Sequence, residues 1–313
     1  MKEVDLLMNA RPYKHVIVMG IDGAGSFIKV ADTPHFDRIF ADGAVTYGAL
    51  ASNPTISAEC WGSMLLGVGP EVHKLKNEIV SSTPYPSDSP YPSLFRRIRA
   101  AMPDAVLGSF CDWNSITKGI VESDLGVFNA TARDTQLAPV ICDFVKGKKP
   151  TFLFCQYDSV DGAGHAAGYG SERHLTRIHE VDELVNDVYE AAREAGILDD
   201  TLFMVIADHG GTPYNGSGAG HGGWSDAEKY VTFAAAGHGV RKGSIDDMNV
   251  RDLAAIVLYA LGLEAPEFSE TGWTSQIPAG LFDDDAIPAY RDISQLTGAE
   301  PRSSRVQHTS EAL

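Results

Sequence analysis

The sequence predicts an α/β fold, a three-layer α/β/α sandwich whose central sheet is mainly parallel. Short runs of β-branched and apolar residues recur along the chain, and patterns typical of amphipathic helices separate them. Uninterrupted apolar runs suit strands that are covered on both faces, and strands that alternate with helices form parallel sheets. Carboxylates directly follow several of these runs, at the edge of the sheet where such folds bind their ligands.

The strand candidates are short and bounded by turn or helix signals. The first reads H-V-I-V-M-G-I over His15–Ile21 and is apolar almost throughout. The remaining strand candidates are residues 105–110, 151–157, 201–207 and 229–236. Helices are predicted over residues 93–102, 171–195 and 250–261.

Two segments are predicted to be loops. Residues 81–93 are crowded with Pro and Ser, which excludes a central strand or a continuous helix, and residues 210–223 are rich in glycine. We expect residues 81–93 and 128–135 to form the substrate rim. With no linker visible in the sequence, we predict one catalytic domain over residues 1–296 and a polar tail over 297–313.

Composition narrows the class of protein. The 313 residues carry a formal net charge of −17, and an acidic surface repels a phosphate backbone, so binding in a nucleic-acid groove is not expected. No apolar run approaches the roughly 18 residues that cross a bilayer, and the acidic N-terminus is unlike a signal peptide. Four cysteines are too few for a disulfide scaffold. We therefore expect a cytoplasmic protein without a membrane span.

Asp161 and His165 form the first candidate metal-binding pair. They lie four residues apart after the strand candidate 151–157, with glycines between them that let both side chains reach one centre. An isolated loop Asp and His are more often solvated than metal-bound, so this pair alone does not decide the question. Asp208 and His209 follow another strand candidate in the same way. The repetition favours metal binding over satisfied core groups.

The candidate ligands at the strand ends are numerous enough for two metal ions. Mixed carboxylate and imidazole ligands suit zinc, with manganese as the alternative, better than calcium, which prefers oxygen. Paired metals about 4 Å apart recur in phosphoryl transfer. His174 and His179, on the polar helix candidate, are interpreted as surface residues. The candidate ligands are Asp22, Asp161, His165, Asp208, His209 and His221.

Ser57 is the candidate nucleophile. The segment N-P-T-I-S-A-E-C-W predicts a helix that begins near Ser57, and the free N–H groups of a helix start can bind phosphate while a metal deprotonates the hydroxyl. Local evidence alone favours a simpler interpretation, in which Ser57 is the N-cap of this helix. Thr55 is the rival hydroxyl, two residues earlier.

A set of motifs occurs in a specific order along the chain. They are I-D-G (21–23), P-T-I-S-A-E-C-W (54–61), G-V-G-P-E-V-H (67–73), D-x-x-D-G-A-G-H-A-A-G (158–168), A-D-H-G (207–210) and G-H-G-G (220–223). Together they resemble the alkaline phosphatase superfamily, nearest to its type I phosphodiesterase and nucleotide pyrophosphatase branch. The resemblance extends from about Val16 to Leu263 and rests on the order of the motifs.

This resemblance implies a two-metal site and a role for each matching residue. One metal would be held by Asp161, His165 and His221, and the second by Asp22, Asp208, His209 and the oxygen of the nucleophile. The family's nucleophilic Thr or Ser falls on Ser57. Asn77 falls near an Asn that contacts a phosphoryl oxygen, and Asp158 matches a second acidic position, where it would support a metal ligand.

The predicted function is hydrolysis of a small-molecule phosphoric ester, of phosphodiesterase or nucleotide pyrophosphatase type, through a phosphoseryl intermediate. A phosphomonoesterase is the main alternative, followed by a non-catalytic metal-binding homologue. A sulfatase is disfavoured because S-A-E-C-W lacks the Pro and Arg of the sulfatase signature. G-I-D-G-A-G has the wrong glycine spacing for a dinucleotide-binding loop, and the chain has no G-x-S-x-G elbow of an α/β-hydrolase.

Overall fold

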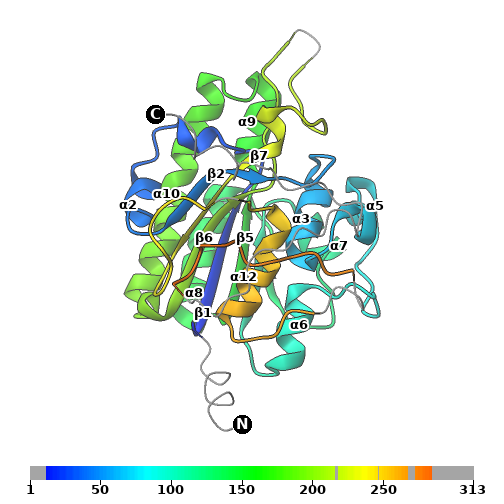
Figure 1. Cartoon of the computed structure of the whole chain (residues 1–313), viewed down its shortest axis with the longest axis vertical. Helices are drawn as coiled ribbons and strands as arrows, with labels where there is room; N and C mark the ends of the chain where they lie inside the picture. Colours follow the sequence, from blue (N-terminus) through cyan, green and yellow to red (C-terminus); the bar gives the residue numbers. More distant parts are fainter. Residues whose placement is uncertain (1–11, 216–217, 246, 267–271, 284–313) are drawn as a thin grey trace, which may run out of the picture.

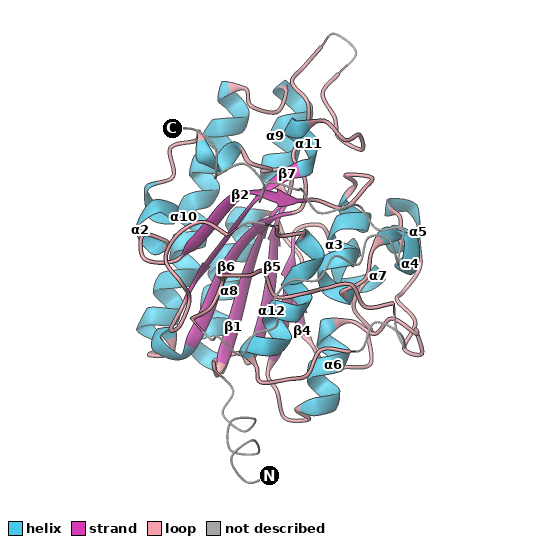
Figure 2. Cartoon of the chain, in the orientation of Figure 1, coloured by secondary structure: helices cyan, strands magenta, loops and turns pink. Residues whose placement is uncertain are grey.

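A seven-stranded sheet runs through the middle of the molecule, in the order β2-β7-β6-β1-β5-β3-β4. The computed structural model describes residues 12–215, 218–245, 247–266 and 272–283. Every strand runs in the same direction except β7, which pairs antiparallel with both of its neighbours. Helices cover both faces of the sheet (Figures 1 and 2), which confirms the predicted three-layer α/β/α fold with a mainly parallel sheet.

The strands agree closely with the sequence prediction where they are fully buried. The bounds of β1 (His15–Ile21) and β6 (Thr201–Ala207) are those predicted. The predictions for β3, β5 and β7 differ by one or two residues at their ends. The remaining strands are β2 (Ala44–Leu50), β3 (Leu107–Cys111), β4 (Phe128–Ala130), β5 (Phe152–Tyr157) and β7 (Tyr230–Ala236).

Two groups of helices lie on opposite sides of the sheet (Figure 2). Around the long helix α10 (Glu172–Glu194) lie α2 (Pro34–Ile39), α8 (Asp134–Lys148) and α9 (Ser159–Ala167). The other group contains α3 (Ser57–Leu66), α5 (Asn77–Ser82), α6 (Leu94–Ala101), α7 (Ser115–Gly119) and α12 (Leu253–Ala260). Shorter helices are α4 (Pro70–His73), α11 (Asp226–Lys229), η1 (Phe27–Lys29), η2 (Leu198–Asp200) and η3 (Val250–Asp252).

Serine caps explain where two of the predicted helices begin. Ser93 Oγ accepts a hydrogen bond from the N–H of Arg96 at the start of α6, and Ser171 does the same for His174 in α10. The interpretation of His174 as a surface residue is wrong, because its side chain is buried and its Nε2 lies 3.2 Å from the carbonyl oxygen of Gly23. His174 belongs to the apolar stripe of α10 that continues with Ile178 and Val181.

Three local predictions need correction. The strands β2 and β4 were not predicted, and β4 takes up the first residues of the segment 128–135 that was expected to be a loop. The start of the expected loop 81–93 is the last turn of α5. Asp161 and His165 lie within α9 rather than in a loop.

Some predictions fall outside the described residues. The tail over 297–313, and the domain boundary before it, lie in the undescribed segment 284–313. In the described part of the chain, no helix is both long and apolar enough to span a bilayer. The four cysteines are all free thiols, and three of them are buried.

Candidate metal centre

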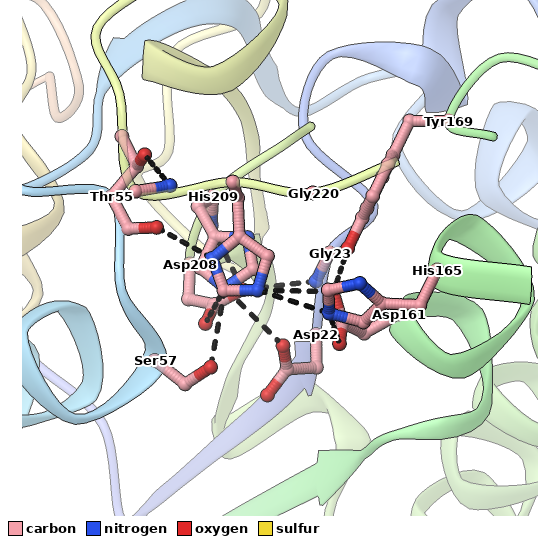
Figure 3. A network of polar contacts seen from close by, with 12 residues as sticks. Asp22, Gly23, Thr55, Ser57, Asp161, His165, Tyr169, Asp208, His209 and Gly220 are labelled. Atoms are coloured by element: carbon pink, nitrogen blue, oxygen red, sulfur yellow. Dashed lines mark hydrogen bonds and ion pairs between the residues drawn. The ribbon is translucent and has the colours of Figure 1, made fainter. Parts of the chain in front are cut away.

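Parallel pairing brings three acidic strand ends to one edge of the sheet. In the register of the sheet, Ile21 at the end of β1 lies between Tyr157 of β5 and Ala207 of β6. The next residues are Asp22, Asp158 and Asp208, so their side chains emerge side by side. The predicted gathering of carboxylates at this edge is therefore present, and Figure 3 shows Asp22 and Asp208 close together there, with Asp161 beside them.

Asp22, Asp208 and His209 form the first group of potential ligands, which we call the buried cluster. Their ligand atoms all lie within 4.8 Å of one another. His209 Nε2 is 3.3 Å from Asp208 Oδ2 and 3.6 Å from Asp22 Oδ1, and at most 2 % of each side chain is exposed. These are three of the six predicted ligands.

The two carboxylates of the buried cluster share one pattern of hydrogen bonds. Asp208 Oδ1 accepts from the backbone N–H groups of Gly23 and His209, and Asp22 Oδ2 accepts from two side chains, Trp61 and Gln156. Among the described residues, the other oxygen of each carboxylate has no hydrogen-bond partner. Both partnerless oxygens face His209 Nε2, so the cluster presents one free oxygen from each carboxylate to a single point.

Asp161, His165 and His221 form the second group, the open cluster. Asp161 Oδ2 lies 3.2 Å from His165 Nε2, and Asp161 Oδ1 lies 3.9 Å from His221 Nε2. About half of the His165 side chain is exposed, 47 % against 14 % for Asp161. Tyr169 donates a hydrogen bond of 2.5 Å to Asp161 Oδ1. The helix α9 accounts for the meeting of Asp161 and His165, since residues four apart share a helical face.

Backbone carbonyl oxygens fix the orientation of all three histidines. In each ring the carbonyl contact is made by Nδ1, which places the Nδ1–H toward the carbonyl and leaves the lone pair on Nε2 for a metal. The contacts are His165 Nδ1 to Ala219 O at 3.2 Å, His209 Nδ1 to Gly210 O at 3.0 Å and His221 Nδ1 to Thr55 O at 2.7 Å.

These atoms fit a pair of metal ions. His165 Nε2 and His221 Nε2 lie only 3.2 Å apart, and with both protons on Nδ1 neither ring can donate to the other. A cation between the ligand atoms would satisfy both lone pairs and the free carboxylate oxygens. The mixture of nitrogen and oxygen donors suits zinc or manganese better than calcium.

Electrostatics at this edge of the sheet also favour a cation. Burial and the neighbouring Asp208 raise the pKa of Asp22, and burial raises the pKa of Asp208 to about 8. Burial lowers the pKa of His209 and of His221, so neither imidazole is protonated to offset the carboxylates. Asp22 and Asp208 therefore lack a cationic partner in the buried cluster, and a bound metal would stabilise their charged forms. In the open cluster, the hydrogen bond with Asp161 raises the pKa of His165 instead.

Ser57 and Thr55 differ in what their hydroxyl groups contact. Ser57 Oγ lies 3.2 Å from His209 Nε2, at the buried cluster. Thr55 Oγ1 accepts from the N–H of Gly222 and donates to the carbonyl oxygen of Gly223, so both functions of this hydroxyl are used by the backbone. Ser57 is the first residue of α3 and Ile56 is its N-cap, so the interpretation of Ser57 as the N-cap is wrong.

Asn77 and Asp158 lie beside the centre. Asn77 Oδ1 accepts a hydrogen bond of 3.0 Å from the N–H of Ala58, the residue after Ser57. Asp158 Oδ1 accepts from Gln156, and burial raises the pKa of Asp158. Both positions are compatible with the roles that the sequence resemblance implies.

The side chains that hold the candidate ligands in place were not predicted from the sequence. Trp61 and Gln156 contact Asp22, and Tyr169 contacts Asp161. Trp61 and Gln156 lie inside segments that read as core helix and core strand, so no local signal separates them from packing residues. Tyr169 lies in the segment G-Y-G after the D-G-A-G-H motif, and an aromatic residue there was the one available signal.

More than half of the chain matches one known protein family. The pattern of the type I phosphodiesterase / nucleotide pyrophosphatase family matches residues 81–256. The chain belongs to this family. The matched range includes Asp158 and five of the six candidate ligands, whereas Asp22 and Ser57 precede it. The resemblance to the alkaline phosphatase superfamily is thereby confirmed.

Curated relatives of this family member are much longer proteins. GPI ethanolamine phosphate transferase 2 of Aspergillus fumigatus is 25 % identical over 225 residues, which cover 69 % of this chain and 29 % of that protein. The protein of the same name in Aspergillus oryzae is 40 % identical over 72 residues, covering 23 % of this chain and 8 % of that one. The chain therefore spans less than a third of the length of these relatives.

Solved structures share the fold at low identity. Murine ectonucleotide pyrophosphatase / phosphodiesterase 5 has a TM-score of 0.65 and 16 % identity, and the match covers 81 % of this chain and 96 % of that one. The PsFucS1 sulfatase of Pseudoalteromonas sp. has a TM-score of 0.64 at 12 % identity, covering 93 % and 75 %. Lipoteichoic acid synthase LtaP of Listeria monocytogenes has a TM-score of 0.60 at 12 % identity, covering 85 % and 79 %. They show the common fold.

Proposed function

We propose that the chain is a metal-dependent phosphoric ester hydrolase of the phosphodiesterase or nucleotide pyrophosphatase type, with Ser57 as its nucleophile. Membership of the family supports this class of reaction. The observation that carries the proposal is the meeting of the Ser57 hydroxyl with the buried cluster. Its Oγ lies 3.2 Å from His209 Nε2, the same nitrogen that the free oxygens of Asp22 and Asp208 face.

Two divalent ions, zinc or alternatively manganese, are proposed to bind at the two clusters. The buried cluster would hold one ion together with the oxygen of Ser57, and the open cluster would hold the other. When bound, these ions supply the positive charge that lowers the pKa of a serine hydroxyl and stabilises phosphoryl oxygens.

The proposed reaction has two chemical steps, and both take place at the oxygen of Ser57. Ser57 Oγ attacks the phosphorus, the bond from phosphorus to the leaving oxygen breaks, and the phosphoryl group is attached to Ser57. Water then attacks the phosphoserine, the bond to Oγ breaks, and Ser57 is restored as a hydroxyl. Asn77 accepts from Ala58 through its amide oxygen, so its NH₂ group is the end available to donate to a phosphoryl oxygen.

The proposed substrates are phosphodiesters or pyrophosphates rather than phosphomonoesters. The support is the family, whose name describes enzymes of this kind. A substrate panel of aryl phosphodiesters, nucleotide pyrophosphates, phosphomonoesters and sulfate esters tests this assignment. A tenfold preference for monoesters in kcat/KM, about 1.4 kcal/mol of transition-state stabilisation, would identify the chain as a phosphatase instead.

A second candidate function is transfer of the phosphoryl group to an alcohol. The similarity to proteins named GPI ethanolamine phosphate transferase 2 favours it. Transfer and hydrolysis would share the phosphoserine and differ only in the group that attacks it. Product analysis in the presence of a primary alcohol separates them, because a transferase forms the new phosphodiester faster than it releases the phosphomonoester that hydrolysis produces.

Ser57→Ala compared with Thr55→Ala tests the nucleophile. With metal content matched, we expect Ser57→Ala to lose at least about 1,000-fold in kcat, since no other hydroxyl of this segment is free to attack. Thr55→Ala is expected to lose less. Two successive inversions should retain configuration at the phosphorus of a chiral phosphorothioate diester. Near wild-type turnover of Ser57→Ala, or net inversion, would show that Ser57 is not the nucleophile.

A further inference from the structure

We propose that Trp61 and Gln156 are positioning residues of the metal centre, which hold Asp22 so that a single oxygen faces the metal. The proposal rests on the metal-dependent function proposed above. It concerns side chains outside both clusters and predicts that they set the affinity of one site only.

The two carboxylate oxygens of Asp22 differ in their hydrogen bonds. Oδ2 accepts hydrogen bonds of 3.0 Å from both Trp61 Nε1 and Gln156 Nε2. Oδ1 has no partner within the described part of the chain and lies 3.6 Å from His209 Nε2. All of these side chains are buried, so water does not substitute for either donor.

The direction of both hydrogen bonds is fixed by chemistry. An indole nitrogen can only donate. The amide of Gln156 is oriented by the backbone N–H of Trp113, which donates to Gln156 Oε1 at 2.9 Å, so the NH₂ group must point the other way. That NH₂ group donates to Asp22 and also to Asp158 Oδ1 at 3.0 Å. The amide oxygen and both N–H groups of Gln156 are therefore engaged in hydrogen bonds.

This arrangement limits Asp22 to one metal contact. With Oδ2 engaged by two donors, Oδ1 is the oxygen left for a metal ligand. Single-oxygen binding keeps the coordination number low, which suits the four-coordinate geometry of zinc better than the six to eight oxygens of calcium. Hydrogen-bond partners of metal ligands orient those ligands, and their loss typically lowers metal affinity by about 10- to 100-fold.

Simple core packing does not account for the Trp61 contact. Trp61 packs edge to face on Phe154, and a Cβ at Gly20 would lie 2.6 Å from its ring, so the ring is tightly enclosed. However, Trp273 is also buried, and its Nε1 has no hydrogen-bond partner among the described residues. Within the described residues, the indole of Trp61 thus donates to a candidate ligand, whereas that of Trp273 contacts no acceptor.

The experiment is a zinc competition titration of the whole chain against a chromophoric chelator, in which the two sites appear as two steps. We expect Trp61→Phe and Gln156→Met each to weaken one step by about 10- to 100-fold and to leave the other step unchanged. The double variant should be weaker than either. Trp273→Phe and Gln136→Met are matched controls, and both steps should stay as in the wild type. Trp273 Nε1 donates to no candidate ligand and has no acceptor among the described residues, and Gln136 is exposed on α8.

Cobalt(II) provides a readout that packing alone would not change. In Trp61→Phe and Gln156→Met, a second contact from Asp22 Oδ2 should shift the visible absorption of the bound cobalt toward a higher coordination number. Unchanged zinc steps and cobalt spectra in both variants would overturn the proposal. Equal weakening of both steps, with a lower Tm, would also overturn it and indicate a general structural role.

The wild-type titration separates this proposal from the proposed function. A wild-type chain that binds two zinc ions and hydrolyses phosphodiesters, while its variants bind zinc equally well, contradicts only the positioning role. A wild-type chain that binds no zinc or manganese contradicts the metal centre itself, and the positioning role with it.

Discussion

The buried and open clusters contain the same kinds of ligand and differ in what holds them. The buried cluster lies at the ends of β1 and β6, with at most 2 % of each side chain exposed, and its Asp208 is fixed by backbone N–H groups. The open cluster combines a helix with the glycine-rich segment, and about half of its His165 is exposed. The sheet thus provides one rigid centre, and a helix with a loop provides an accessible one.

The difference indicates a division of roles between the clusters. The buried cluster lies against the Ser57 hydroxyl, the proposed nucleophile, which would require a fixed geometry. The open cluster has the solvent access that an incoming water or a departing product requires. Changes at the buried cluster should therefore be more severe and harder to compensate than matched changes at the open cluster.

Loss of a carboxylate ligand should have the largest effect. We expect wild-type protein to retain two metal ions per chain after dialysis, and Asp208→Asn to lose one of them and about 1,000-fold in kcat/KM, equivalent to about 4 kcal/mol. Asp161→Asn should lose the other ion with a smaller kinetic effect. Elemental analysis and kinetics measure both. Full metal occupancy in a triple variant of Asp22, Asp161 and Asp208 would show that these residues do not bind metal.

Chemical rescue with imidazole should distinguish the two clusters, with a smaller loss of activity than the loss of a carboxylate ligand causes. His165→Gly is expected to lose about 100-fold in activity and to regain part of it with added imidazole, because the site of the missing ring is open to solvent. His209→Gly should lose more and should not be rescued, since its ring is fully buried. Comparable rescue of both variants would contradict the proposed difference in access.

Tyr169 should have a smaller effect that is confined to the open cluster. Tyr169→Phe removes the hydrogen bond to Asp161 Oδ1 but retains the ring, which also contacts His165 and His174. We expect zinc affinity at one site to fall by about tenfold. Chelator competition measures this, with the exposed Tyr214→Phe as the control. An unchanged affinity would leave Tyr169 with a packing role only.

A pH effect on stability should occur away from both clusters. Burial lowers the pKa of His73 to about 4, while its unfolded value is about 6.5. Between these values the unfolded state binds more protons, so stability is complete above pH 6.5 and falls as the pH decreases toward 4. At pH 5 the loss should be about 2 kcal/mol relative to pH 7.

Urea unfolding of the wild type and His73→Gln at pH 7 and pH 5 measures this contribution. Metal-dependent losses are common to both proteins and cancel in the difference between them. His73→Gln should be less stable at pH 7 and less sensitive to pH. Equal pH dependence of the two proteins would contradict the assignment to His73.

The fold was predictable where the apolar pattern is local, and not where distant residues decide the structure. β1 and β6 are uninterrupted apolar runs, and their predicted bounds hold. β2 is only partly buried and pairs with β7, whose reversed direction leaves no mark in the sequence. The helix α9 contains two internal glycines, which disfavour a helix. Its start is capped from elsewhere, because Asp134 accepts from the N–H groups of Asp158 and Ser159.

In the candidate site, too, local features were predictable from the sequence and contacts between distant residues were not. Residue types and spacing selected the six candidate ligands and Ser57, and the structure brings these candidate ligands together in two groups. Their supporting contacts could not be predicted, since Trp61, Gln156 and Tyr169 come from three different elements. His174 was misassigned although it lies four residues before the apolar Ile178, which was a usable signal.

The carbonyl contacts of the three histidines have a consequence for how this site can evolve. Each Nδ1 faces the oxygen of the main chain rather than a side chain. No single substitution removes a main-chain oxygen. The backbone conformation therefore determines that the proton of each imidazole is on Nδ1. A substitution at the residue that bears the carbonyl leaves this oxygen in place, so the three Nε2 atoms keep their lone pairs as long as the backbone keeps its path. The orientation of the three imidazoles therefore depends on the fold of the main chain more than on any one neighbouring side chain.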